Sequence, residues 1–474
     1  MQRVGEEQPE TRGGSQVRMT VLRDCEGTPK EGVLLMINAS PSSRDDTRGI
    51  SPSRAHFLFF CLVGAYFFSF FFRISASVVL PSQAAKLGMS AALTGFLSSL
   101  YYYAYSVMQS ISGALHDRFG PLRVVAGGML VAAAGTFLLV LHPSEWTLGA
   151  WRLFTGLGLA PMYGGALVYQ ASAFSPDKYV FYSSVTISVG AFGALASVAP
   201  LGLALDAFGL SATFAGLTLL SISMSVLLWK ERGFDPVVQR TPFKEQKTQS
   251  ILSRLAEALR LIRSSAYLRA LLVLWTVSAG ALLSFQGLWA VSWYQTAYGV
   301  EASTARNWAS LVSVGMFIGT VVFGGFCRRP EDRFRGVCFW TLFNVASWGA
   351  LVSSIALKLP LPFAGTCGFL IGAANGLIAV QASSAAKEQV ETAKTGALLG
   401  TMNMIVIFVV ILFQWGTGIL INLFPGGRAG EFTEDGFLVC FLIVTLLLAG
   451  SLPALPPLRR ADTRRRENPS TRRR

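Results

Sequence analysis

The sequence has few charged residues for its length. Only 14% of the 474 residues are Asp, Glu, Lys or Arg, whereas a soluble domain has about a quarter. Apolar residues make up 52% of the chain, and the mean hydropathy is +0.49. This composition excludes a soluble enzyme, a disordered chain and a disulfide-stapled secreted module.

The chain also lacks the patterns of metal and disulfide sites. Its six Cys residues contain no C-x-x-C pair and show no metal-ligand spacing, and there are only three His residues. Scattered Cys residues of this kind act as small buried hydrophobes. We therefore expect no metal ion, no cofactor and no catalytic site.

Charged residues are absent from eleven long segments, each with room for the roughly 20 apolar residues of a membrane-spanning helix. A twelfth apolar segment is interrupted only by Arg73. The sequence therefore predicts an all-α membrane protein with twelve transmembrane helices. The predicted spans are 55–80, 90–115, 121–142, 146–174, 179–205, 210–229, 269–297, 304–327, 336–357, 361–384, 396–424 and 436–456.

The positions of the basic residues predict the orientation. Connections on the side of the termini hold 26 Lys and Arg residues, without counting the N-terminal segment, and the opposite connections hold 4. Basic residues stay on the cytoplasmic side of a membrane. We expect a multi-pass protein of the plasma (inner) membrane with both termini cytoplasmic, and the basic pI is no evidence for nucleic acid.

The spans divide six and six around a basic linker. We expect two six-helix pseudo-repeats around a central cavity, an arrangement that many secondary transporters share. The linker has amphipathic helical spacing from Ile251 to Ile262, and the basic tail is expected to touch anionic lipid. The expected parts are a disordered cytoplasmic segment 1–54, the N-terminal half 55–229, the linker 230–268, the C-terminal half 269–456 and the tail 457–474.

The connection after the second span carries a recognisable motif. Residues 113–123 read GALHDRFGPLR, which resembles the loop signature G-x-L-x-D-R-x-G-x-x-R/K of the major facilitator superfamily. In that role Gly113 permits close packing against a helix of the other half, Asp117 pairs with arginine at a helix N-terminus, and Gly120 makes the turn. With Arg118 and Arg123, these residues are the predicted cytoplasmic gate.

The resemblance extends to two further spans. Residues 152–158, RLFTGLG, are similar to the superfamily pattern R-x-x-x-G-x-G in the fourth span, and residues 72–81, FRISASVVLP, are similar to the first span of its organic-anion carriers. The resemblance implies a transporter that works by alternating access, with no enzymatic activity.

Two arginines lie inside predicted spans, Arg73 and Arg152, and no Asp or Glu lies deep in any span. Ionisable residues within the membrane are costly and usually functional. A guanidinium binds carboxylate or phosphate in a bidentate manner, so we expect an anionic substrate held by Arg73 with help from Arg152. The alternatives are snorkelling of Arg73 to the interface, and a structural or gating role for Arg152 in contact with backbone carbonyls.

Polar and aromatic residues at helical spacing are expected to line the cavity beside the arginines, although such stripes also serve as packing. The predicted binding residues besides Arg73 and Arg152 are Tyr101, Tyr105, Gln109, Tyr163, Gln286, Trp293 and Asn375; Trp289, Asn307, Gln381, Asn403 and Gln414 are further polar or aromatic groups in the spans.

These features predict a monomeric carrier of a small organic anion of the carboxylate type, with membrane lipid as its other partner. A carrier of a neutral sugar, peptide or drug-like solute is the main alternative, and a non-transporting receptor is another. A membrane-embedded enzyme would need His, Asp or Glu clusters within the spans, which are absent. The sequence leaves uniport, anion exchange and cotransport open.

Overall fold

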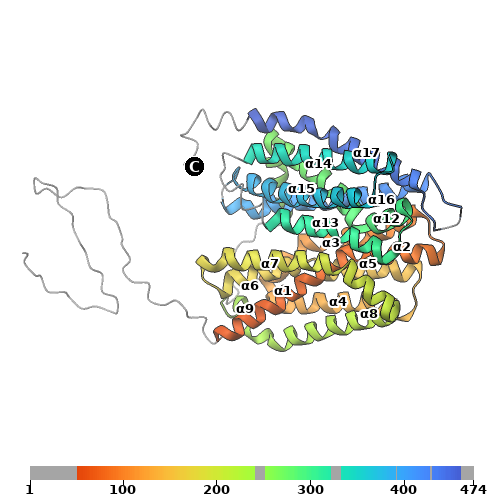
Figure 1. The fold of residues 1–474 in the computed structure, drawn as a ribbon. Helices are drawn as coiled ribbons and strands as arrows, with labels where there is room; N and C mark the ends of the chain where they lie inside the picture. The colour runs from red at the N-terminus through yellow and green to blue at the C-terminus, as the bar shows by residue number, and fades with distance from the viewer. Residues whose placement is uncertain (1–50, 241–250, 322–332, 391, 428–429, 461–474) are drawn as a thin grey trace, which may run out of the picture. The chain divides into compact units, whose positions relative to one another are not determined.

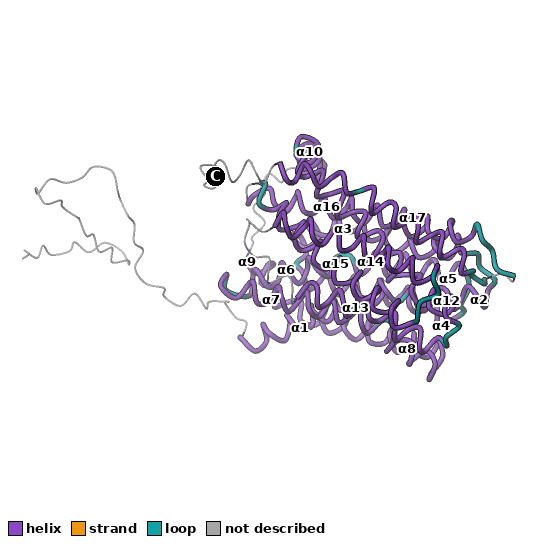
Figure 2. Tube along the Cα trace, turned by 45° about the horizontal axis from the view of Figure 1, so that its top comes forward, coloured by secondary structure: helices purple, strands orange, loops and turns teal. Residues whose placement is uncertain are grey.

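The computed structural model describes residues 51–240, 251–321, 333–390, 392–427 and 430–460. Most of the expected segment 1–54 and tail 457–474, and part of the linker, therefore lie outside the described residues. Within the described residues the secondary structure is helical, and β-structure is limited to one isolated bridge between Pro425 and Phe432 (Figure 2).

The first six predicted spans correspond to consecutive helices. Gly209 has a φ of 77° inside α8, so the segment before it completes the fifth span begun by α7, and the segment after it is the sixth. This N-half consists of α1 (Pro52–Ile74), α2 (Ala76–Leu87), α3 (Ala91–Phe119), α4 (Pro121–Leu141), α5 (Glu145–Leu159), α6 (Met162–Ala173), α7 (Pro176–Ala196) and α8 (Ala199–Lys230).

The last six spans come after a linker of short helices. The linker holds η1 (Glu231–Phe234), α9 (Pro236–Arg240) and α10 (Ile251–Ser264), and η5 (Leu452–Ala454) lies after the last span. The C-half consists of α11 (Ala266–Ser284), the π-helical turn η2 (Phe285–Trp289), α12 (Ala290–Tyr298), α13 (Ala302–Val321), α14 (Arg333–Ala356), α15 (Leu361–Lys387), α16 (Thr392–Asn422) and α17 (Glu434–Gly450).

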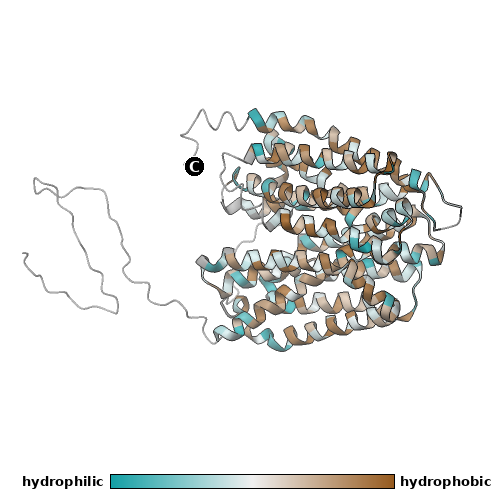
Figure 3. Cartoon of the chain, in the orientation of Figure 1, coloured by the Kyte–Doolittle hydropathy of each residue, from teal (hydrophilic) through white to brown (hydrophobic). Residues whose placement is uncertain are grey.

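Eight helical stretches of the described residues are long and apolar enough to cross a membrane. The other four crossings, made by α3, by α5 with α6, by α7 and by α13, are shorter or carry more polar side chains. Figure 3 shows apolar residues along most of the length of the helices. Large apolar side chains are exposed on the bundle, among them Leu203, Phe208, Leu219 and Leu446, as expected for helices that face lipid rather than water. The chain is an all-α, twelve-span membrane protein.

The two ends of the helix bundle are distinguished by the residues that lie there. Twelve crossings bring the start of α1 and the residues after α17 to the same end, which we name the terminal end. The opposite end, which holds Leu87, Asp206 and Arg306, is the pocket end. In Figure 1, α9 lies at the terminal end, and α2 and α12 lie at the pocket end.

The two halves are in contact at the pocket end and in the middle of the bundle. α3 packs against α16, α2 packs against η2 and α12, and α13 packs against α7 and α8. Hydrogen bonds join Arg306 to Asp206 and Asn403 to Gln109. Arg306 and Asp206 lie at the pocket end, whereas Asn403 and Gln109 lie farther along α16 and α3.

Glycines allow the close crossing of α3 and α16 near the pocket end. A Cβ atom on Gly95 would lie 2.6 Å from the Gln414 carbonyl oxygen, and one on Gly418 would lie 2.5 Å from the Ala91 carbonyl oxygen. Real Cβ atoms do not approach backbone oxygens so closely, so any larger residue here would force the halves apart.

The first and seventh spans are both interrupted where they face each other. The first span breaks at Ser75, between α1 and α2, and the Ser75 hydroxyl donates to the Phe72 carbonyl at 3.1 Å. The seventh span contains η2, which contacts both α1 and α2. π-Helical turns and broken membrane helices often occur at functional sites, which directs attention to this region.

Candidate functional site

Arg73 lies in the last turn of α1, directly before the break at Ser75. The residue is 9% exposed. Its guanidinium carbon lies 4.7 Å from the ring centres of both Phe70 and Tyr105, and aromatic faces attract cations. The guanidinium is therefore placed among aromatic rings inside the bundle, and not on its surface.

No carboxylate neutralises this cation within the described residues. The two ion pairs there are Arg54 with Glu231 and Arg306 with Asp206, and the Nε of Arg73 is buried without a hydrogen-bond partner. A buried charge that lacks a counter-ion is unfavourable. The aromatic rings reduce this cost but supply no negative charge, so an anion would complete the site.

Arg152 on α5 has different surroundings. It is 0% exposed, and its two terminal nitrogens donate to the Phe72 carbonyl at 2.7 Å and the Ser98 carbonyl at 3.1 Å. Its guanidinium carbon lies 4.6 Å from the ring centre of Tyr101. These contacts connect the first, second and fourth spans, which favours the structural alternative for Arg152.

Two of the predicted tyrosines lie together on α3. The rings of Tyr101 and Tyr105 are stacked at 5.8 Å and 20°, and the Tyr101 hydroxyl donates to the Ser69 carbonyl at 3.0 Å. Tyr101 is thus fixed between the two arginines, with its ring centre 6.0 Å from the guanidinium carbon of Arg73.

Tyr66 belongs to the same cluster and is absent from the predicted site. Its ring lies 5.0 Å from that of Tyr163, which is how Tyr163 joins the cluster. The signal was present in the sequence, since Tyr66, Phe70 and Arg73 are spaced i, i+4 and i+7 along α1 and share one face of the helix. We name Tyr66, Arg73, Tyr101, Tyr105 and Tyr163 the central cluster.

Three further polar groups with unpaired atoms lie on η2 or beside it. A Cβ on Gly287 would lie 3.3 Å from the Gln414 side-chain nitrogen and 3.4 Å from the Tyr102 hydroxyl. Gln414 donates to the Leu283 carbonyl at 2.6 Å, which leaves its Oε1 unpaired. The Tyr102 hydroxyl and the Oε1 of Gln286 also have no partner among the described residues.

Gln286 and Gln109 form hydrogen bonds to other helices of the bundle. Gln286 donates from Nε2 to the Ser313 hydroxyl at 2.8 Å. Gln109 accepts from Asn403 at 3.1 Å and so connects α3 with α16. Gln109 therefore joins the two halves, in addition to any role in binding.

Trp293 and Asn375 are not brought to the central cluster. Trp293 packs in an aromatic group with Phe285 and Phe441, at ring distances of 5.7 Å to each. Asn375 accepts from the Ser278 hydroxyl at 2.7 Å and donates to Asn344 at 3.3 Å, a network within the C-half. The structure gives no support to a binding role for these two residues.

The predicted gate is only partly formed. Gly120 has a φ of 81° and makes the expected turn. The close approach expected at Gly113 is not present, because a Cβ there would meet nothing within 4 Å. Asp117 and Arg118 are exposed, and within the described residues neither they nor Arg123 form an ion pair.

Asp235, which the sequence reasoning missed, is the acidic group in contact with this loop. It is fully buried, and its carboxylate accepts from the backbone of Leu122 at 2.9 Å and of Val237 at 3.0 Å. It caps the start of α9 and also binds the first turn of α4. The sequence signal was the Asp-Pro step at Pro236, since Asp followed by proline is a typical helix start.

Solved structures share this fold. The chain matches a structure described as a bacterial homologue of the human lysosomal transporter Spinster, in an inward-facing and occupied conformation. The TM-score is 0.61 at 17% identity, over 88% of this chain and 96% of the other. At this identity the match supports the fold alone.

Two sequence relatives differ in their described roles. A probable chloroplastic anion transporter from Oryza sativa subsp. japonica is 26% identical over 53% of this chain, and the match spans only about half, 49%, of the length of that relative. The membrane sensor protein UhpC of Salmonella typhimurium is 23% identical over 72% of this chain and 80% of its own length.

The family assignment agrees with the fold and with the loop motif. Residues 62–414 match the model of the Major Facilitator Superfamily, which is more than half of the chain. The Spinster-homologue structure has the same arrangement of helices. The chain is a multi-pass membrane protein that belongs to the Major Facilitator Superfamily.

Proposed function

We propose that this protein is a secondary transporter that moves a small organic anion of the carboxylate type by alternating access. The observation that carries the proposal is Arg73, a buried guanidinium with an unpaired Nε and no carboxylate partner among the described residues. A substrate that brings its own negative charge would remove this imbalance, and a neutral substrate would not.

The geometry of the central cluster suits a carboxylate. A guanidinium presents parallel N–H donors that match the two oxygens of a carboxylate. The rings of Tyr105 and Phe70 flank the cation and exclude water, which strengthens the attraction to an anion. Arg152 already donates to two carbonyls, so we assign it to positioning and Arg73 to binding.

The unpaired groups beside η2 suit the other end of the substrate. The Tyr102 hydroxyl can donate, and the Oε1 atoms of Gln286 and Gln414 can accept. They come from both halves, so a substrate that reaches from Arg73 to Gln414 would contact the N-half and the C-half together. Such bridging lets binding change the relative stability of the two transport states.

Transport by purified protein in proteoliposomes tests the proposal. The probes are radiolabelled benzoate, succinate and glycerol 3-phosphate, with benzamide as a neutral probe of similar shape. We expect uptake or exchange of at least one anion. We expect R73Q to lower it by about 10- to 100-fold, because a hydrogen bond to a charged group contributes about 1.5–3 kcal/mol.

Two variants serve as controls for this experiment. R73K keeps the charge without the bidentate geometry and should retain part of the activity. R54Q removes an arginine that is paired with Glu231 near the surface and should leave uptake unchanged. Uptake by R73Q equal to wild type for every transported anion would refute the binding role of Arg73, and competition by neutral solutes at every pH would favour the neutral-solute alternative.

A sensor is the second candidate, because the match to the sensor protein UhpC spans 72% of this chain. A sensor needs to bind its ligand but not to move it across the membrane. Binding of benzoate or succinate by the purified protein, together with no uptake or exchange under any imposed gradient, would support this alternative over transport.

We further propose that the terminal end faces the cytoplasm at the plasma membrane and that the protein is a monomer in contact with lipid. The excess of basic residues in the connections at the terminal end supports this orientation. Labelling of a single Cys at Glu301, at the pocket end, by an impermeant thiol reagent on intact cells would test it. Protection of this position would contradict the orientation.

A further inference from the structure

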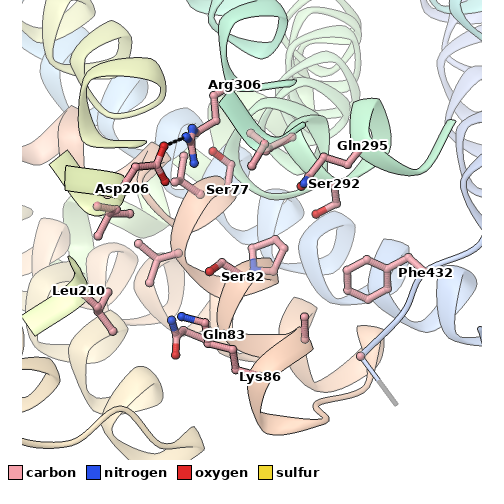
Figure 4. A pocket seen from close by; sticks show the side chains of 18 of the residues that line it. Ser77, Ser82, Gln83, Lys86, Asp206, Leu210, Ser292, Gln295, Arg306 and Phe432 are labelled. Atoms are coloured by element: carbon pink, nitrogen blue, oxygen red, sulfur yellow. Dashed lines mark hydrogen bonds and ion pairs between the residues drawn. The ribbon is translucent and has the colours of Figure 1, made fainter. Parts of the chain in front are cut away.

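A pocket of about 650 Å³ lies at the pocket end, between the two halves and apart from the central cluster. Figure 4 shows polar side chains from both halves pointing into it. Its polar and charged lining comes from α2, from the turn at Gly209, from α12 and α13, and from the segment before α17: Ser77, Gln83, Lys86, Asp206, Ser292, Gln295, Arg306 and Glu431.

One ion pair joins the two halves at this pocket. Arg306 near the start of α13 donates to Asp206 on α8, and Figure 4 shows the pair at one rim of the pocket. The two side chains differ sharply in exposure, since Arg306 is 8% exposed and Asp206 is 54% exposed. Water can therefore stabilise the carboxylate if the pair separates, but it cannot reach the guanidinium in the same way.

A second cation lies in the same pocket without such a partner. Lys86 near the end of α2 is exposed, and it forms no ion pair with the described residues. Lys86 belongs to the N-half and Arg306 to the C-half, so one anion in the pocket can meet a cation from each half.

We propose that this pocket is a second binding site for the anionic substrate, in which the acidic group of the substrate takes the place of Asp206 on Arg306. The inference deepens the proposed function and rests on it. Asp206 and the incoming anion compete for one buried guanidinium, so the ion pair between the halves opens only when another anion is present to neutralise Arg306.

The surroundings define the class of ligand. Arg306 and Lys86 select a carboxylate, sulfonate or phosphate group, the hydroxyls of Ser77 and Ser292 can hydrogen-bond to the rest of the molecule, and Phe432 offers an aromatic face. The guanidinium lies directly against Gly202, where any Cβ would overlap it. Arg306 is therefore fixed in the pocket, whereas Asp206 is free to turn toward water.

Pulsed electron paramagnetic resonance can measure the opening of the pocket end. Spin labels at His142 and Glu301, one on each half, report the distance across it in the full-length protein in nanodiscs, with Cys25, Cys327 and Cys338 replaced by Ser. With wild type we expect a short distance without anion, and at least a threefold larger long-distance population with benzoate but not with benzamide.

Variants of the pocket test whether the anion opens the pocket end by replacing Asp206 on Arg306. D206N should show the long distance without any anion and should bind benzoate at least fivefold more tightly, because the competitor is gone. K86Q should keep the short resting distance and need about fivefold more benzoate. D206E keeps the carboxylate and should remain closed, and E145Q, at an exposed acid of the same end, should behave as wild type.

The result that overturns the inference is a D206N protein that stays closed without anion and responds to benzoate as wild type does. R73Q separates this inference from the proposed function, since it removes the central site and leaves the pocket intact. A distance response that survives in R73Q supports the pocket even if no anion is transported, whereas a response lost in R73Q and unchanged in D206N assigns anion binding to the central cluster alone.

Discussion

At the scale of single residues, the two intramembrane arginines show how neighbours decide a role. The Nε of each is unpaired, but the terminal nitrogens of Arg152 donate to carbonyls of the first and second spans, whereas Arg73 lies among the rings of Phe70 and Tyr105. The sequence predicts that both are buried, because each interrupts or borders an apolar span. It cannot predict which one finds backbone partners, since those carbonyls belong to other helices.

The different surroundings of Arg152 and Arg73 predict that substitution by Gln has different effects at the two positions. R152Q removes two hydrogen bonds from a charged donor to the Phe72 and Ser98 carbonyls, each worth about 1.5–3 kcal/mol, so the unfolding temperature in detergent should fall while the Kd for benzoate changes little. R73Q should leave the unfolding temperature close to that of wild type and weaken benzoate binding. Thermal unfolding followed by Trp fluorescence, with titration calorimetry, measures both; equal loss of stability in the two variants would contradict the assignment.

At the scale of elements, the irregular turn in the seventh span separates two side chains that regular helical spacing would place together. Gln286 and Trp293 are seven residues apart, which places them on one face of a regular helix. The π-turn η2 adds a residue to one turn and rotates the next helical segment, α12, by about 100°. As a result Gln286 binds Ser313 on α13 and Trp293 packs against Phe441 on α17. Local sequence patterns do not reveal such a turn.

The glycine crossing of α3 and α16 makes a prediction with an internal control. G418A places a methyl group against the Ala91 carbonyl oxygen, an overlap that costs about 1–3 kcal/mol and is relieved when the halves separate. The distance between labels at His142 and Glu301 should lengthen. G416A, two residues away with open space around it, should leave the distance unchanged, and identical distances in the two variants would show that the crossing does not hold the pocket end closed.

The contact between the linker and the loop after the second span also belongs to this scale. D235A removes the acceptor for the Leu122 and Val237 amides, and loss of such a cap costs about 0.5–2 kcal/mol. The unfolding temperature should therefore fall. D117A removes an exposed acid from the same loop and should not lower it; a larger effect of D117A than of D235A would reverse the assignment.

At the scale of the whole molecule, the number of crossings is set by where charge is absent, and the structure confirms it. The sequence also anticipates most of the central cluster, since Arg73, Tyr101, Tyr105 and Tyr163 come together. The sequence does not predict the ion pair that joins the two halves. Arg306 and Asp206 resemble ordinary loop charges in the sequence, because their pairing depends on the relative position of two helices a hundred residues apart.

Because the pocket end is closed in this state, the unpaired gate loop is expected to act in the opposite state. Asp117 forms no ion pair with the described residues in this state, so its charge can stabilise only a state in which the terminal end closes and a helix N-terminus approaches it. Such a contact contributes about 1 kcal/mol, and a substitution that removes it shifts the population of the two states about fivefold. D117N should therefore lower anion turnover about fivefold and leave the unfolding temperature unchanged, whereas K178Q, at an exposed residue of the same end, should alter neither. Turnover in proteoliposomes with D117N equal to wild type would mean that the loop motif does not act as a latch, and that contacts at the pocket end alone set the balance between the two states.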